Sequence, residues 1–253
     1  MSDLVKTHAI VIRHTPHTET SRIIQWVTED HGKLVTLAKG AMRPRNPLLG
    51  QFDQLYTCEL VYYARGQDKV LITREVTALK TRDRFRTDWR AHIAAQYMTD
   101  LTARIMPQHE PAPELFTLLD DGLDELNDRG WHAPTLFCYE LRLLETLGLH
   151  PKLDRCAVCN QPFATGHRAE FSSRRGGMVC DACQRDPDGH VASADILAIL
   201  AHWQRGRDWT VARTARCAPA QLNTIRAING DFLRYHLDIR TTARDATLNL
   251  LAA

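Results

Sequence analysis

The first 80 residues alternate short apolar stretches with turn residues. β-Branched, aromatic and aliphatic side chains fill five such stretches, at residues 8–12, 22–28, 33–38, 55–63 and 70–76. Asp30-His31-Gly32 separates the second stretch from the third at the distance of a hairpin turn. Five short strands in this length predict a five-stranded OB-type β-barrel. An SH3-like barrel has nearly the same periodicity and stays open as an alternative.

The hydrophobic period changes to that of a helix after residue 88. Apolar residues then recur every four positions, at Trp89, Ile93, Tyr97, Leu101 and Ile105. Similar stripes follow at residues 115–126, between Pro134 and Gly148, after Ser193, and at residues 222–233. Proline suits the first turn of a helix, serine its N-cap and glycine its end. The stripes predict a central and C-terminal α-helical bundle whose apolar faces form its core.

Together these patterns predict an α+β multidomain protein. We expect an OB-fold nucleic-acid-binding domain at residues 1–80 and an α-helical domain at residues 81–151 and 190–253. A small module is expected at residues 152–189, inserted into the helical domain. This segment is rich in cysteine, glycine and arginine and poor in large apolar residues. Burial alone therefore cannot stabilise it, and it needs another source of stability.

Two Cys-x-x-Cys pairs lie in this inserted module. They consist of Cys156, Cys159, Cys180 and Cys183, with twenty residues between the pairs. The spacing is typical of zinc ribbons, in which two tight turns each supply two thiolates to one tetrahedral Zn²⁺. The alternatives are four incidental thiols or a thioredoxin-like redox pair. A redox pair is expected on a βαβ unit, which this pattern lacks.

Four thiolates complete the coordination shell of zinc and leave no position for water or substrate. We therefore expect one structural Zn²⁺ per chain, held in a four-cysteine zinc finger. His167 is a spare candidate ligand that we interpret as a surface loop residue. Cys58, Cys138 and Cys217 are isolated in the sequence, and we interpret them as small buried hydrophobic residues.

Charge is distributed unevenly, although the formal net charge is only +2. Residues 33–45 contain four basic side chains and no acidic one, whereas residues 110–145 contain nine acidic side chains and two arginines. A chain of this kind can bind a polyanion locally without being basic overall. Solvated surfaces of opposite sign would explain the same distribution.

The loop predicted at residues 39–50 begins with Lys39-Gly40-Ala41-Met42-Arg43-Pro44-Arg45. Its glycine lets the backbone approach a ligand closely, and Lys39, Arg43 and Arg45 supply cations for phosphate contacts. OB barrels bind single strands across the face and loops of such strands. Aromatic residues on the neighbouring strands are interpreted mainly as core. They are Trp26, Phe52, Tyr56, Tyr62 and Tyr63.

Several functional classes lack support in the sequence. It contains no apolar run of about 18 residues that could span a membrane, and its first residues lack a signal-peptide core. We therefore expect a protein of the reducing cytosol. It also lacks the phosphate-binding loop of NTPases, the serine nucleophile elbow, the zinc-protease pair of histidines and the deaminase signature. An enzyme with a small-molecule substrate is not predicted.

Several blocks of the sequence resemble the RecO family of bacterial recombinational repair proteins. In the first domain these are residues 10–13, 19–24, 29–33 and 38–44, the last being Ala38-Lys39-Gly40-Ala41-Met42-Arg43-Pro44. Later blocks are residues 137–149, Pro151 and Leu153 with the first cysteine pair, and Phe171-Ser172 with Gly176-Gly177 before Cys180. The blocks follow the family's order and cover residues 8–183.

The resemblance implies an N-terminal OB domain, a central helical domain and a zinc finger held by the four cysteines. RecO-like proteins bind single- and double-stranded DNA and anneal complementary strands. With RecR they help load RecA onto strands coated by single-strand-binding protein. Carried over by residue, the resemblance places DNA contacts at Lys39 and Arg43, with Arg22 and Lys33 as neighbours. It also implies a cytoplasmic, nucleoid-associated protein.

The C-terminal segment departs from the family pattern, which usually ends in a basic tail. Arg240 and Arg244 are the candidates left there for contact with DNA. Two other functions fit the residues. One is an RNA-binding or transcription-associated protein built from an OB barrel and a zinc ribbon, because phosphate contacts look the same for both polymers. The other is a protein scaffold whose acidic middle and arginine-rich end bind different proteins.

Overall fold

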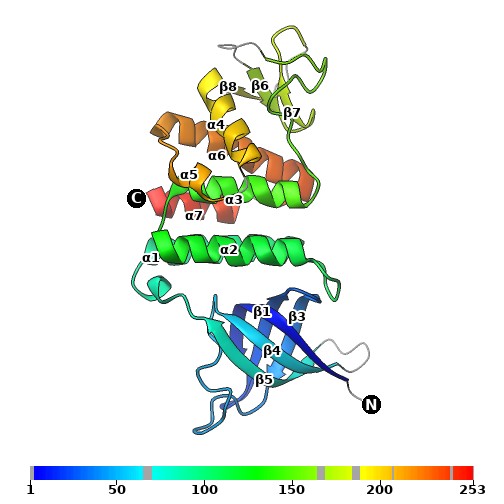
Figure 1. Ribbon diagram of the computed structural model, residues 1–253, viewed down its shortest axis with the longest axis vertical. Helices are drawn as coiled ribbons and strands as arrows, with labels where there is room; N and C mark the ends of the chain where they lie inside the picture. The colour runs from blue at the N-terminus through cyan, green and yellow to red at the C-terminus, as the bar shows by residue number, and fades with distance from the viewer. Residues whose placement is uncertain are drawn as a thin grey trace. The chain divides into compact units, whose positions relative to one another are not determined.

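The chain folds into two compact units, Met1–Gly130 and Trp131–Ala253. The computed structural model describes residues 3–64, 70–163, 169–183, 189–206, 208–239 and 242–252. Figure 1 shows the helices and strands of both units. No helix in these described ranges is long and apolar enough to cross a membrane.

Five strands of the first unit form a closed barrel. They are β1 (Asp3–Pro16), β2 (Arg22–Thr28), β3 (Gly32–Ala38), β4 (Thr57–Ala64) and β5 (Leu71–Lys80). Their order is β1-β2-β3-β5-β4, and β4 pairs back onto β1 to close the barrel. The neighbours β3 and β5 are parallel, and the other pairs are antiparallel. This five-stranded Greek-key closure confirms the predicted OB-type fold.

Alternating burial along the strands separates the barrel interior from its outer surface. In β3, Leu34, Thr36 and Ala38 are buried, and the residues between them are partly exposed. Inside, the indole Nε1 of Trp26 donates to Thr36 Oγ1 at 2.9 Å. Thr36 Oγ1 in turn accepts from Thr73 Oγ1 at 2.7 Å, so the polar atoms of this core are hydrogen-bonded to one another.

The aromatic residues near the basic loop mostly belong to this core, as predicted. Trp26, Phe52, Tyr56 and Tyr62 are all buried in it. Tyr63 instead lies on the outer side, where its hydroxyl accepts from Arg74 Nη1 at 3.1 Å. The buried rings stabilise the barrel and are not available to stack on bases.

Two long helices of the first unit lie beside the barrel (Figure 1). A short 3-10 helix, η1 (Asp83–Arg86), leads to α1 (Trp89–Ile105) and α2 (Pro113–Arg129). Asp88 Oδ1 caps α1 by accepting from the backbone amide of Ala91 at 3.0 Å. Ile10, Ile12 and Val27 are buried although they lie outside the barrel core, and α1 contacts β1. The outer face of β1 and β2 therefore forms part of a second hydrophobic layer.

Arg82 ties α2 to the barrel through a buried guanidinium whose side chain is 1% exposed. It donates to Leu55 O and Thr57 Oγ1 on the barrel side, both at 2.8 Å. On the helix side it pairs with Asp120 at 2.6 Å and Asp124 at 2.8 Å. Lys80 bridges the same two carboxylates. Each nitrogen of the buried Arg82 guanidinium thus has a hydrogen-bond partner. A buried ion pair stabilises a fold only when its polar groups are satisfied in this way.

In its described residues, the second unit combines a small sheet with five helices. The helices are α3 (Ala133–Thr146), α4 (Ala194–Arg205), α5 (Thr210–Arg213), α6 (Pro219–Leu237) and α7 (Thr242–Ala252). The strands β6 (Ala169–Ser172), β7 (Gly177–Val179) and β8 (His190–Ala192) form a sheet in the order β7-β6-β8. The sequence stripes predicted α3, α4 and α6 but not α5 or α7. Asp238 ends α6 in a left-handed conformation, φ 51°, after which the chain starts α7.

A buried ion pair joins the first and last helices of this unit. The carboxylate of Glu140 on α3 accepts from Arg244 on α7 at 2.7 and 2.8 Å, and both side chains are nearly inaccessible. Asn229 on α6 donates to the same carboxylate at 3.1 Å. A Cβ atom on Gly230 would lie 2.7 Å from Arg244 Nη1. The glycine therefore gives the guanidinium its path to Glu140.

The prediction that Arg244 contacts DNA is wrong, because its side chain is buried and pairs with Glu140 inside the fold. The other candidate in the tail, Arg240, lies outside the described residues. The two units also group the helices differently from the single helical domain expected at residues 81–151 and 190–253, since α1 and α2 belong with the barrel. The domain boundaries at residues 80, 151 and 189 remain predictions.

We predict that Arg82→Met lowers the free energy of unfolding at neutral pH by about 3 kcal/mol, because it leaves the partly buried carboxylates of Asp120 and Asp124 with only Lys80 as an ion-pair partner. Desolvation raises the pKa of Asp120, but hydrogen bonds from Lys80, Thr57 and Arg82 outweigh it and leave that pKa lowered. Because the pKa of Asp120 is lower in the folded state, the ionised carboxylate stabilises the fold at pH values above its unfolded-state pKa of about 3.9. This stabilisation is lost as the pH falls through the folded-state pKa.

The difference between Arg82→Met and the parent should consequently shrink as the pH falls below about 4, because the carboxyl of Asp120 is protonated first in the unfolded chain and only at lower pH in the folded one. Urea denaturation across a pH series measures this. Arg74→Met is the matched control, because Arg74 pairs with Glu75 on the exposed surface, and we expect no pH-dependent change from it. A stability gap of constant size down to acidic pH would contradict the ion-pair explanation.

We further predict that Arg244→Met lowers the free energy of unfolding by about 3–5 kcal/mol, because it leaves the buried Glu140 carboxylate without its cation. The double variant Glu140→Leu with Arg244→Met should recover a large part of that loss, because no unpaired charge remains. Urea denaturation of both variants gives the comparison, and hydrogen exchange in α7 locates the effect. A single variant as stable as the parent would show that the pair is not buried in solution.

Candidate functional site

The basic loop after β3 borders a surface cavity of about 550 Å³. Lys39 and Arg43 line it from one side, and the turn between β1 and β2 lines it from the other. The remaining lining residues are small or polar apart from Leu37, and none is acidic: His17, Thr18, Thr20, Ser21, Leu37, Gly40 and Asn46. Hydroxyls, an amide and two cations around one space suit an anion with several oxygen atoms.

Backbone and core contacts hold this loop in place. The amide of Gly40 donates to Ser21 Oγ at 3.1 Å, and the amide of Met42 donates to Thr20 O at 2.9 Å. Ala41 between them is buried in the barrel core. Gly40 has φ 64°, a conformation that glycine adopts without steric cost. The loop is thus fastened on both sides of Ala41, and Lys39 and Arg43 are exposed.

The structure brings together only part of the predicted set of basic residues. Lys39 and Arg43 share one cavity. Arg22 is partly buried and donates to Ser21 O at 3.1 Å, so it braces the turn that forms the opposite wall. Arg45 is exposed but does not line the cavity. The contributions of Thr18, Thr20 and Ser21 were not predicted, because the contacts between this turn and the loop link residues about twenty positions apart.

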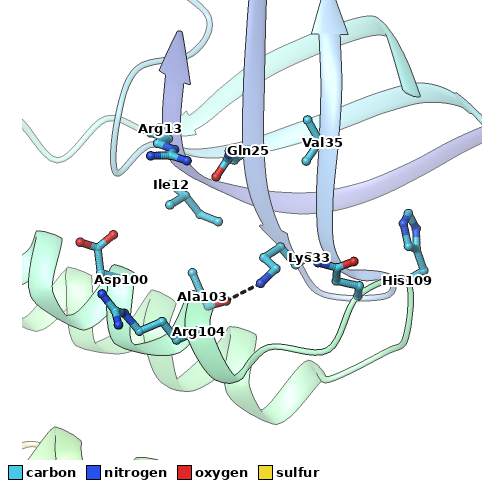
Figure 2. A pocket seen from close by; sticks show the side chains of 10 residues that line it. Ile12, Arg13, Gln25, Lys33, Val35, Asp100, Ala103, Arg104 and His109 are labelled. Atoms are coloured by element: carbon cyan, nitrogen blue, oxygen red, sulfur yellow. Dashed lines mark hydrogen bonds between the residues drawn. The ribbon is translucent and has the colours of Figure 1, made fainter. Parts of the chain in front are cut away.

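Lys33 lies at a different place, at the junction of β3 and the end of α1. Its Nζ donates to the carbonyl of Ala103 at 2.9 Å, as Figure 2 shows. This carbonyl belongs to the last turn of α1, where carbonyls lack partners within the helix and the dipole favours a cation. The backbone amide of Lys33 also donates to Pro107 O at 2.8 Å. Lys33 therefore has a structural role in addition to any role in binding.

Gly32 explains why the chain can approach so closely at this junction. A Cβ atom on Gly32 would lie 2.3 Å from Pro107 O and 2.4 Å from Glu110 O. Its φ of 61° also lies in the region that side chains rarely adopt. The Asp30-His31-Gly32 turn, expected only as a hairpin, thus also receives the segment that follows α1.

The four cysteines of the inserted module meet in space, as the spacing predicted. Their sulfur atoms all lie within 4.8 Å of one another. Three of the separations are 3.8 Å (Cys156 to Cys183), 3.7 Å (Cys159 to Cys180) and 3.6 Å (Cys180 to Cys183). Four sulfurs at a Zn–S distance of about 2.3 Å from one tetrahedral ion would be about 3.8 Å apart. The cluster therefore has the dimensions of a four-thiolate metal site.

The two cysteine turns are joined through the small sheet. Asn160 follows the first pair with φ 60°, and its amide donates to Cys156 O at 3.0 Å. The amide of Ala157 donates to Met178 O at 2.7 Å, which links the first turn to β7. A Cβ on Gly177 would lie 2.4 Å from Lys152 O, so only glycine permits this approach.

Backbone amides point at the sulfur cluster and favour its ionisation. Val158 N and Cys180 N each lie 3.4 Å from Cys156 Sγ. Burial raises the pKa of Cys156, but amides of Cys159, Cys180 and Val158 outweigh it and lower the pKa to about 6. A hydrogen bond with Cys180 is the main cause that raises the pKa of Cys183 to about 12. One thiolate thus forms readily, and a cation at the centre would favour all four.

The other cysteines lie apart from this cluster. Cys58 and Cys138 are buried, and burial raises the pKa of Cys58 to about 12 and that of Cys138 to about 11. Their interpretation as small core residues is confirmed. Cys217 is partly exposed, so it is less buried than predicted. The spare ligand candidate His167 lies outside the described residues.

Comparison with known proteins covers nearly the whole chain. The family model described as recombination protein O N terminal matches residues 1–82, and the model described as recombination protein O C terminal matches residues 86–245. Similar proteins carry the name DNA repair protein RecO. One from Anaeromyxobacter dehalogenans strain 2CP-C is 29% identical over 243 residues, which cover 96% of this chain and 95% of the relative.

Two further relatives carry the same name. The protein from Rhodopirellula baltica is 31% identical over 195 residues, covering 76% of this chain and 72% of the relative. The protein from Moorella thermoacetica is 26% identical over 251 residues, covering 96% and 90%. The barrel, the helical part, the cysteine cluster and these matches agree, and the chain belongs to the RecO family of DNA repair proteins.

Proposed function

We propose that this protein is a non-enzymatic recombination mediator that binds single- and double-stranded DNA and anneals complementary strands. With RecR it helps load RecA onto single strands coated by single-strand-binding protein. The observation that carries the DNA-binding part is the cavity of Lys39 and Arg43, which combines two exposed cations with hydroxyls and no lining carboxylate. Family membership supports the remaining steps.

The chemistry of the cavity suits a phosphodiester. A phosphate in it can accept from the Lys39 ammonium and, with two oxygens, from the Arg43 guanidinium. Such contacts position a strand without reading its bases. A mediator that must act on any damaged sequence needs this kind of recognition. Neutralising phosphates on two strands also lowers the repulsion that slows annealing.

We also propose a cellular location and protein partners for this chain. RecR and single-strand-binding protein are the protein partners, and the protein works in the cytoplasm on the nucleoid. No reaction is assigned to it, because annealing and loading change contacts between macromolecules and need no covalent step by this chain.

We propose zinc as the ion for the cysteine cluster. Cys156, Cys159, Cys180 and Cys183 would hold it, and four thiolates in a tetrahedron are the ligand set that structural zinc prefers. Bound there, zinc supplies cross-linking between the two cysteine turns and no catalysis. The few apolar residues of the module make this cross-link its main source of stability.

RNA binding is the second candidate function, because the cavity contacts would fit either backbone. The measurement that tests the proposal is strand annealing in the absence of ATP. Complementary DNA strands coated with single-strand-binding protein should anneal faster with this protein, and the acceleration should fade as salt rises. Tight binding to RNA without any acceleration of DNA annealing would favour the alternative.

We predict that Lys39→Glu with Arg43→Glu weakens DNA binding about tenfold or more at about 0.1 M salt and flattens the salt dependence. With each lost phosphate contact, fewer counterions are released when DNA binds, so the affinity depends less on the salt concentration. Fluorescence anisotropy with labelled oligonucleotides measures both quantities. The control is Arg129→Glu with Arg205→Glu, which changes the net charge equally at two exposed helix ends. If both double variants bind alike, the basic loop is not the site.

For the metal we predict about one zinc ion per chain after purification without chelators, by elemental analysis under reducing conditions. Cys156→Ser with Cys183→Ser should abolish retention of zinc. In that variant, amides of β6 to β8 should exchange rapidly while those of the barrel keep their protection, since the barrel has its own core. A reduced protein with no bound metal would reject the assignment.

A further inference from the structure

A second cavity, of about 720 Å³, lies on the first unit between the barrel and α1. Figure 2 shows its walls: strands β1, β2 and β3 on one side, and α1 with the segment that follows it on the other. Ile12, Val35 and Ala103 supply apolar surface, and Gln25 and Gln108 supply amides. Arg13, Lys33, Arg104, His109 and Asp100 supply the groups that are charged or can become so.

Three cations and one carboxylate give this cavity a net positive charge. Arg13 and Arg104 are exposed, and Figure 2 shows them on opposite walls. Lys33 uses one hydrogen bond for the carbonyl of Ala103. An ammonium group has three donors, so Lys33 can still contact a ligand while it caps the helix.

The strand register places this cavity in line with the basic loop. Arg13 lies opposite Gln25, and Gln25 lies opposite Val35, so the three form one row across the sheet. Along β3, the alternate residues Lys33, Val35 and Leu37 are the partly exposed ones, and Lys39 is the first residue after the strand. The first two line this cavity and the last two line the cavity of the basic loop. At about 3.3 Å per residue, the six residue steps from Lys33 to Lys39 span at most about 20 Å.

We propose that this cavity is a second phosphate-binding site, and that a single DNA strand runs from Lys39 along the outer row of β3 to Arg13, Lys33 and Arg104. This inference rests on the proposed function and adds a site to it. Val35 and Leu37 lie between the two cationic ends and offer apolar surface to the nucleotides there. A span of about 20 Å fits the few nucleotides that one OB barrel binds.

The position of the cavity favours single strands over duplex. Its cations face a recess bounded by α1 rather than a flat surface. A single strand can bend into such a recess, whereas duplex DNA is stiff over about 150 base pairs. Loss of the cavity cations should thus affect single-stranded DNA more than duplex.

Asp100 opposes phosphate in this cavity. Its carboxylate interacts with Arg104 and Arg13, and Figure 2 shows it beside Arg104. In the absence of DNA it offsets part of the positive charge. Its removal should therefore strengthen binding, an effect opposite in sign to that of structural damage.

The experiment uses fluorescence anisotropy of the full chain with an oligothymidine of about 20 nucleotides and with a duplex of equal length, over a salt series. The variants are Arg13→Ala with Arg104→Ala, Asp100→Asn, and Arg129→Ala as a control at the exposed end of α2. Arg13→Lys with Arg104→Lys retains the charge and tests whether charge rather than packing matters. Lys39→Glu with Arg43→Glu is measured in parallel.

We expect the double alanine variant to bind single strands roughly tenfold more weakly at low salt, with a salt slope smaller by about 0.7 to 1.4. Duplex binding should change by less. Asp100→Asn should bind single strands roughly twofold to fivefold more tightly. The lysine variant should stay within about twofold of the parent, because it neutralises the same number of phosphates, and the affinity of Arg129→Ala should not change.

Two results would overturn the proposal. The first is a double alanine variant that binds like Arg129→Ala while Lys39→Glu with Arg43→Glu loses affinity, which leaves the proposed function standing with the basic loop alone. The second is an Asp100→Asn variant that is folded and binds single strands no tighter than the parent. If neither set of basic residues affects binding, the proposed function fails as well.

Discussion

The guanidinium of Arg82 lies between the barrel and α2 and donates hydrogen bonds to both. It contacts the segment before β4 through Leu55 O, and α2 through Asp120 and Asp124. Because α2 packs on α1, this buried cation also sets where α1 stands beside the barrel. The barrel forms walls of the cavity at the basic loop and of the cavity beside α1, and the second also needs α1. The buried guanidinium of Arg82 thus helps to set the positions of the exposed basic residues that line the cavity beside α1.

A second contact holds the far end of α1. There Gly32 lets Pro107 and Glu110 approach the barrel backbone, and Lys33 caps the helix through Ala103 O. With Arg82 near the start of the helical segment and Lys33 at the end of α1, the cavity wall is fastened at two places. Pre-formed walls lower the ordering cost of binding. They would favour the strand binding that we propose for this surface.

Basic residues in this chain have two different uses. Arg82 and Arg244 are buried and paired with carboxylates, and they stabilise one unit each. Lys39 and Arg43 are exposed around a cavity without acidic residues. In the cysteine module, four sulfur atoms at metal-site distances accompany a few buried apolar residues, among them Phe171 and Met178. Basic residues therefore stabilise the fold where they are buried and paired, and are available for binding where they are exposed.

The sequence alone determined the features that depend on short-range periodicity or spacing. Apolar stretches bounded by turn residues marked the five strands of the barrel, four-residue stripes marked α1, α2, α3, α4 and α6, and the cysteine spacing marked the cluster. Each follows from the geometry of a single element or of a metal ion. The turn after α6 and the short helices α5 and α7 carried no comparable stripe and were missed.

Only the tertiary structure decided which charges are available. Arg244 and Arg43 look alike in sequence, yet the fate of Arg244 depends on Glu140, which lies about a hundred positions away. Lys33 became a helix cap because α1 ends beside it, and Arg13 and Arg104 share a cavity because the barrel and helix are packed together. The burial and pairing of a charge are set by elements distant in sequence, so local pattern cannot supply them.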